Sequence, residues 1–89
     1  MEATILLAED EARLRTVVRD YFAAHGVACR TAVDGAEALE ALRERDYDAV
    51  LLDVMMPGPD GFAVCRAVRE RSGVPILFLT ALGDEAHAL

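Results

Sequence analysis

The apolar residues of this chain change their spacing repeatedly, and this alternation restricts the possible folds more than any other feature of the sequence. Short, continuous apolar runs alternate with longer stretches in which apolar residues recur at helical spacing. Because most of these runs are almost entirely apolar, we expect strands of a parallel sheet that is covered on both faces, with a weaker strand over 27–32. The runs predicted as strands span residues 4–8, 27–32, 48–52 and 74–79.

Three complete helices are predicted between these strands, and each has a recognisable boundary residue. The first carries an apolar stripe that we expect to face the sheet: Leu14, Val17, Val18, Tyr21 and Phe22. Gly26 is expected to end this helix in the left-handed conformation. Asp34, with Glu37 three residues later, is predicted to cap the second helix, and Asp60 the third.

Strands and helices in this alternating order indicate right-handed βαβ units around a parallel sheet. We therefore expect an α/β fold with a flavodoxin-like strand order and helices on both faces. The sequence supplies four strands and three full helices, and residues 83–89 predict the start of a fourth helix. Compared with a closed, two-faced sheet of this kind, the pattern is one strand and one helix short.

The composition excludes several classes of protein. Sixteen acidic and nine basic residues give a net charge of −7, so a direct contact of this segment with nucleic acid or an anionic membrane is not expected. A hydrophobic fraction of 54% excludes a disordered chain. No apolar stretch approaches the ~20 residues of a membrane span, and no secretory leader is recognisable, so we expect a cytoplasmic protein. Cys29 and Cys65 lack C-x-x-C spacing, which favours two reduced, buried thiols.

Oxygen-bearing side chains stand at the carboxyl ends of three predicted strands. Glu9 and Asp10 follow the first strand, Asp53 ends the third, and Thr80 follows the fourth. In an open parallel sheet, ligands bind beyond the carboxyl ends of the strands, where the strand order reverses. We therefore expect the three carboxylates to converge there.

Carboxylates gathered in this way repel one another and require a cation. At ~4.5 Å and an effective dielectric constant of about 20, each ionised pair is destabilised by roughly 3–4 kcal/mol. All nine basic residues are arginines, so no lysine can offset this repulsion. A ligand set made only of oxygen atoms favours Mg²⁺ and argues against zinc.

Asp53 differs from the other acids because it follows a buried strand directly and leads into a loop. A carboxylate at such a place can act as a nucleophile, and beside magnesium it suits phosphoryl transfer. The hydroxyl of Thr80 is then expected to hydrogen-bond the transferred group. Taken singly, each residue has a simpler explanation: Asp10 as the cap of the first helix, Asp53 as a turn residue, and Thr80 as a cap.

Three segments of the chain, in this order and spacing, resemble the receiver domain of bacterial response regulators. They are LLAEDE (6–11), LLDVMMPGPDGF (51–62) and PILFLTA (75–81). The amino-acid sequences of the second and third segments are most similar to those of regulators with a winged-helix DNA-binding output. The resemblance therefore implies a cytoplasmic two-component signalling module that controls transcription.

The resemblance also implies a role for each residue of the site. Asp53 would accept a phosphoryl group from a sensor histidine kinase. Asp10, Asp53 and the backbone carbonyl of Met55 would bind magnesium, with Glu9 assisting. Thr80 would be the switch hydroxyl that moves to the phosphoryl group. The module would catalyse only its own phosphorylation and would not be a metabolic enzyme.

Members of the family continue with a further strand that ends in an active-site lysine, an aromatic switch residue and a final helix. None of these is found within residues 1–89. We therefore expect a receiver domain over 1–89 that is incomplete at its C-terminus. It would be either the front portion of a longer receiver or a chain that forms a homodimer through its exposed sheet edge or exchanged elements.

Other functions remain open to the sequence. Without the lysine, the chain could be an inert fragment or pseudo-receiver that acts only through protein contacts. A haloacid-dehalogenase-like phosphatase also uses a strand-end aspartate, but it places a second acid two residues later, where this chain has Met55. A flavodoxin needs a Ser/Thr/Gly phosphate loop after the first strand, where this chain has Glu9-Asp10-Glu11-Ala12.

Overall fold

Seven elements alternate strictly between strand and helix in the computed structural model, which describes residues 2–79. In chain order they are β1 (Thr4–Ala8), α1 (Ala12–Ala24), β2 (Ala28–Ala32), α2 (Gly35–Glu44), β3 (Ala49–Asp53), α3 (Gly61–Arg69) and β4 (Ile76–Leu79). The predicted strands and complete helices are confirmed. The helix expected over 83–89 and the residue Thr80 lie outside the described residues.

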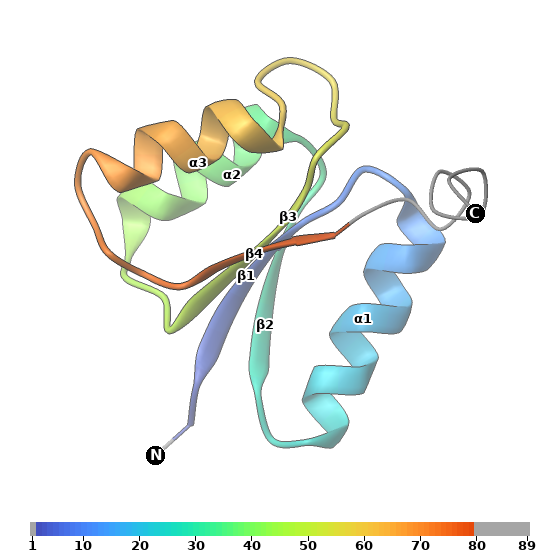
Figure 1. Ribbon diagram of the computed structural model, residues 1–89. Coiled ribbons are helices and arrows are strands. Elements are labelled where there is room, and N and C mark those ends of the chain that lie inside the picture. Colours follow the sequence, from blue (N-terminus) through green and yellow to red (C-terminus); the bar gives the residue numbers. More distant parts are fainter. Residues whose placement is uncertain (1, 80–89) are drawn as a thin grey trace, which may run out of the picture.

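The four strands form one parallel sheet in the order β2-β1-β3-β4. This confirms the flavodoxin-like order, in which β1 and β3 are neighbours although a strand and two helices separate them in sequence (Figure 1). The register pairs Ala8 with Leu52, so the two strands finish side by side. The residues that follow β1 therefore lie next to the end of β3.

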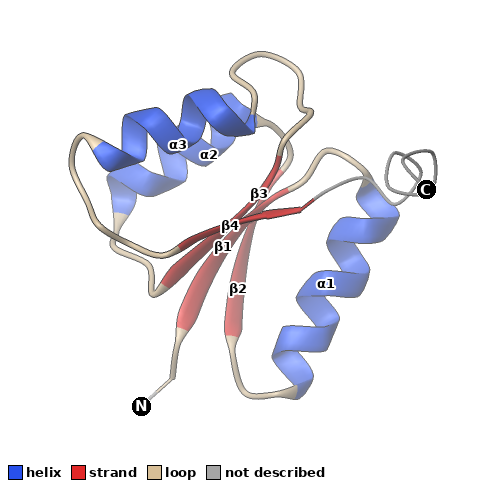
Figure 2. Cartoon of the chain, in the orientation of Figure 1, coloured by secondary structure: helices blue, strands red, loops and turns tan. Residues whose placement is uncertain are grey.

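Helices cover both faces of the sheet, as Figure 2 shows. On the face of α2 and α3, a continuous core includes the fully buried Leu6, Leu52 and Val64. On the opposite face, Leu7 and its neighbours pack against Phe22 and other half-buried residues of α1 and the following strand. In the part of the chain that is described, no helix is long and apolar enough to cross a membrane.

The prediction that the whole apolar stripe of α1 faces the sheet was wrong for two residues. Val18 and Phe22 pack against the core, but Val17 is 64% exposed and Tyr21 is 59% exposed. The stripe contains two rows of side chains spaced four residues apart, and only the row with Val18 and Phe22 reaches the sheet. Tyr21 instead packs against the neighbouring rings of Phe22 and His25.

Hydrogen bonds confirm the predicted caps of α2 and α3, and the conformation of Gly26 confirms the predicted end of α1. Asp34 accepts a hydrogen bond from the backbone N–H of Glu37 at 2.8 Å, and Asp60 accepts one from that of Ala63 at 2.9 Å. Gly26 follows α1 with a φ of 77°, the left-handed region that glycine adopts without a steric penalty. These local bonds fix where α2 and α3 start.

The packing of the larger core predicts a large difference between two leucine variants. Leu52→Ala opens a cavity at a fully buried position, so it should lower the free energy of unfolding by about 2–5 kcal/mol. Leu77→Ala is the matched control, because Leu77 is 60% exposed, and its effect should stay near about 0.5 kcal/mol. Urea unfolding followed by circular dichroism measures both; equal losses would contradict the described core.

Candidate functional site

Three carboxylates meet where the strand order reverses. Glu9, Asp10 and Asp53 each offer an oxygen, and these atoms lie within 4.8 Å of one another. Glu9 is 3% exposed and Asp53 8% exposed, whereas Asp10 is open to solvent. The structure therefore brings together the acids that the ends of β1 and β3 place at one edge of the sheet.

Backbone contacts hold Glu9 in this position from two sides. Its N–H donates to the carbonyl of Ala32 at the end of β2, at 3.0 Å, and its own carbonyl accepts from Nη1 of Arg15 at 2.8 Å. Its carboxylate accepts from the N–H of Glu11 at 3.0 Å. The role of Arg15 was not found from the sequence, because one arginine on a helix face carries no signal for a contact with a preceding loop carbonyl.

Asp10 does not cap α1, so the simpler explanation of this residue was wrong. The cap is Glu11, whose carboxylate accepts hydrogen bonds from the N–H groups of Arg13 at 2.8 Å and Leu14 at 3.1 Å. Because Glu11 satisfies the free N–H groups of the first helical turn, the carboxylate of Asp10 is left in the cluster with Glu9 and Asp53.

Asp53 is held at the start of the loop that joins β3 to α3. Its Oδ1 accepts a hydrogen bond from the N–H of Met55 at 3.2 Å. The helix α3 starts directly against this strand end, where the N–H of Gly61 donates to the carbonyl of Val54 at 3.0 Å. A Cβ atom at Gly61 would overlap the carbonyl of Asp53, so only glycine permits this approach. The sequence alone gave no sign of this contact.

The cluster concentrates negative charge that arginines do not neutralise. Within residues 2–79 the ion pairs are Arg19–Asp20 and Arg30–Glu44, and neither involves the three acids. The pKa of Glu9 is raised from 4.5 to about 7, chiefly because the carboxyl is buried and, to a smaller extent, because the carboxylates of Asp53 and Asp10 lie nearby. The hydrogen bond from the N–H of Glu11 acts in the opposite direction but is weaker.

The donor set fits a hard divalent cation. Only oxygen atoms face one another in the cluster, and no cysteine or histidine of the described chain joins them. Met55 stands at the rim, 68% exposed, in a shallow hollow that it shares with Asp10 and Phe62. Thr80 lies outside the described residues, so its predicted place at the site stays a prediction.

A parallel α/β sheet with a strand-end carboxylate cluster at its reversal defines a class of domains that bind ligands at this edge. The family pattern of the response regulator receiver domain matches residues 5–89. The chain belongs to this family of signalling domains, and the resemblance found in the sequence is confirmed.

Curated relatives are named as regulators of transcription. The chain is 46% identical over 86 residues to the transcriptional regulatory protein ResD of Bacillus subtilis (strain 168), covering 97% of this chain and 36% of that protein. It is 42% identical over 82 residues to the transcriptional regulatory protein AfsQ1 of Streptomyces coelicolor, covering 92% and 36%. The chain thus spans about a third of the length of these relatives.

Solved structures share the fold along nearly the whole chain. The chemotaxis response regulator CheY4 of Vibrio cholerae superposes with a TM-score of 0.87 at 33% identity, covering 99% of this chain and 77% of that one. The response regulator TrrA of Thermotoga maritima, in complex with Mg²⁺–BeF, gives a TM-score of 0.85 at 32% identity, covering 98% and 76%.

The close approach at Gly61 predicts that an added methyl group destabilises the site. Gly61→Ala places a Cβ atom against the backbone of β3, so it should lower the free energy of unfolding by about 1–3 kcal/mol. Gly73→Ala is the matched control, because no atom lies within 4 Å of its added Cβ. Urea unfolding compares the two; a harmless Gly61→Ala would contradict the described contact.

The raised pKa of Glu9 predicts that the chain loses stability as the pH rises when no divalent cation is present. The folded chain holds the proton more tightly than the unfolded chain. This contribution is therefore complete below about pH 4.5 and is lost as the pH rises through about 7. Thermal melts in EDTA between about pH 5 and 8 measure it.

Glu9→Gln should flatten this pH dependence, since an amide does not titrate in the range. The exposed Glu40→Gln should keep the dependence of the wild type. A Glu9→Gln curve that runs parallel to the wild-type curve would contradict the described environment of Glu9.

Proposed function

We propose that this chain is the phosphoacceptor switch of a two-component system, in which Asp53 receives a phosphoryl group from a sensor histidine kinase. The observation that supports this most directly is the place of Asp53: it ends a buried strand, inside an acidic cluster, in a member of the receiver family. A carboxylate held at a strand end in this way can act as a nucleophile.

The transfer itself needs little covalent chemistry from the protein. A carboxylate oxygen of Asp53 attacks the phosphorus of a phosphohistidine, the P–N bond breaks, and its electron pair returns to the imidazole nitrogen of the kinase. The product is an acyl phosphate on Asp53. The hydrogen bond from the N–H of Met55 to Oδ1 fixes the rotation of the carboxylate, so one oxygen stays available for attack.

Asp10, Asp53 and the backbone carbonyl of Met55 would hold Mg²⁺, and Glu9 would assist. When bound, the ion supplies the positive charge that offsets the crowded carboxylates and the phosphoryl oxygens. Glu9 would have to give up its proton to assist, because a protonated carboxyl is a poor metal ligand.

Thr80 directly follows β4 in sequence, and we propose its hydroxyl as the group that binds the phosphoryl oxygen and signals the change. Because relatives about three times as long are named regulators of transcription, we propose a transcriptional output in the cytoplasm. This segment would not contact DNA itself, since its net charge is −7.

Incubation with acetyl phosphate and Mg²⁺ tests the proposal. Intact-mass spectrometry should show a gain of one phosphoryl group in the wild type and none in Asp53→Asn. The matched control is Asp60→Asn, which changes an exposed acid that caps α3 outside the cluster, and it should still gain the group. An unmodified wild-type mass would favour the alternative, an inert receiver that acts only through protein contacts.

A further inference from the structure

A groove lies between the carboxyl-terminal ends of α2 and α3, on the edge of the sheet opposite the acidic cluster. Its volume is about 370 Å³, which falls within the range of small-molecule pockets. Six of its twelve lining residues are apolar and come from both helices and the segments that follow them; we call them the apolar floor: Leu39, Leu42, Tyr47, Ala67, Val68 and Val74. A depression of this size is large enough to enclose one aromatic ring system.

Arginines stand on both sides of this groove. Arg43 and Arg45 come from the end of α2, and Arg71 follows α3 on the other side. Two acids, Asp46 and Glu70, also line the groove, which leaves one more positive than negative charge. The groove is therefore positive in a chain whose net charge is −7.

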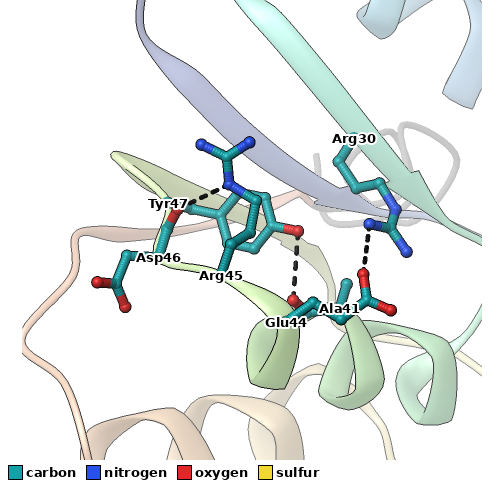
Figure 3. A network of polar contacts seen from close by, with 6 residues as sticks. All are labelled: Arg30, Ala41, Glu44, Arg45, Asp46 and Tyr47. Atoms are coloured by element: carbon teal, nitrogen blue, oxygen red, sulfur yellow. Dashed lines mark hydrogen bonds and ion pairs between the residues drawn. The ribbon is translucent and has the colours of Figure 1, made fainter.

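Arg45 and Tyr47 are held in place by contacts of their own, as Figure 3 shows. The guanidinium carbon of Arg45 lies 5.4 Å from the centre of the Tyr47 ring, and its Nε donates to the carbonyl of Asp46 at 3.1 Å. The hydroxyl of Tyr47 donates to the carbonyl of Ala41 at 3.3 Å. The terminal nitrogens of Arg45 have no further hydrogen bond within the described chain.

The groove arginines differ from arginines that have a structural partner. Arg69 donates to the carbonyl of Val74 at 2.6 Å, and Arg30 pairs with Glu44 at 2.8 Å (Figure 3). Across residues 2–79, the side chains of Arg43 and Arg71 form no hydrogen bond or ion pair. Cations near helix ends also balance the helix dipoles, but that role needs neither a groove nor an apolar floor.

We propose that this groove binds a small organic anion with an aromatic body, such as an aryl carboxylate or aryl sulfonate. The apolar floor takes the ring system, and the arginines that line the groove, Arg43, Arg45 and Arg71, attract the acid group and offer it charge-assisted hydrogen bonds. Because the groove and the acidic cluster lie at opposite edges of the sheet, this binding is independent of the function proposed for Asp53.

The experiment uses anilinonaphthalene sulfonate as the probe and its uncharged relative phenylnaphthylamine as the comparison. Fluorescence titration measures affinity, and amide chemical shifts of the 89-residue chain locate the site. We expect the sulfonate to shift the amides of Leu42, Tyr47 and Val68, and to bind about tenfold more tightly than the uncharged compound. Shifts confined to other surfaces, such as the exposed Phe62, would overturn the proposal.

Two variants distinguish the contribution of the arginine charges to binding from that of the open volume of the groove. Arg43→Gln combined with Arg71→Gln should weaken the sulfonate about tenfold and leave the uncharged compound unchanged. Ala67→Met fills the groove and should abolish both. Arg13→Gln, on the exposed start of α1, is the matched control and should bind as the wild type does.

Unchanged sulfonate binding in the double arginine variant would overturn the proposal. Groove shifts caused only by an acidic peptide, with none from the sulfonate, would overturn it in favour of a macromolecular partner.

Discussion

Mutual repulsion of three carboxylates is the constraint on which the rest of this structure depends. Oxygens of Glu9, Asp10 and Asp53 lie within 4.8 Å, where each ionised pair costs roughly 3–4 kcal/mol at an effective dielectric constant of about 20. The carboxylates stay close together despite this repulsion because β1 and β3 are neighbours in the sheet and the backbone hydrogen bonds between them fix their ends. The pKa of Glu9 is raised chiefly by burial, and the repulsion from Asp53 and Asp10 adds to the effect of burial. A cation that enters the cluster would relieve this repulsion, which supports the metal-dependent function proposed for Asp53.

Much of the fold could be predicted because local chemistry decides it. Continuous apolar runs mark strands buried on both faces, and the caps Asp34 and Asp60 act within three residues of their own position. The convergence of the acids also follows from simple geometry. Parallel strands end at the same edge of the sheet. Since β1 and β3 are neighbours, the residues that directly follow β1 lie beside the residue that ends β3. Every inference of this kind needed only neighbours in sequence or the direction of a strand.

What the sequence did not give depends on distant parts of the chain. Val17 and Tyr21 read as core residues, yet α1 meets the sheet along one row only, and the width of that contact is a property of the packed layers. The need for glycine at position 61 arises from the backbone of Asp53, and no local pattern records it. The capping of α1 by Glu11 was missed because Asp10 fits the same role by residue type. In each case the outcome depends on how the residues are arranged in the folded chain, which local sequence patterns do not record.

The direction of the helices explains why acids and free arginines gather at opposite edges of the sheet. In a parallel α/β fold the amino ends of α1 and α3 lie beside the carboxyl ends of β1 and β3, so partial positive charge points toward the acidic cluster. Acids that cap these helices, such as Glu11 and Asp60, add to the negative edge without entering the cluster. The carboxyl ends of α2 and α3 leave partial negative charge at the other edge, which favours arginines there. Arg43, Arg45 and Arg71 line the groove at this edge, so the same polarity that serves the acidic site favours, in our proposal, a second ligand place that takes an anion rather than a cation.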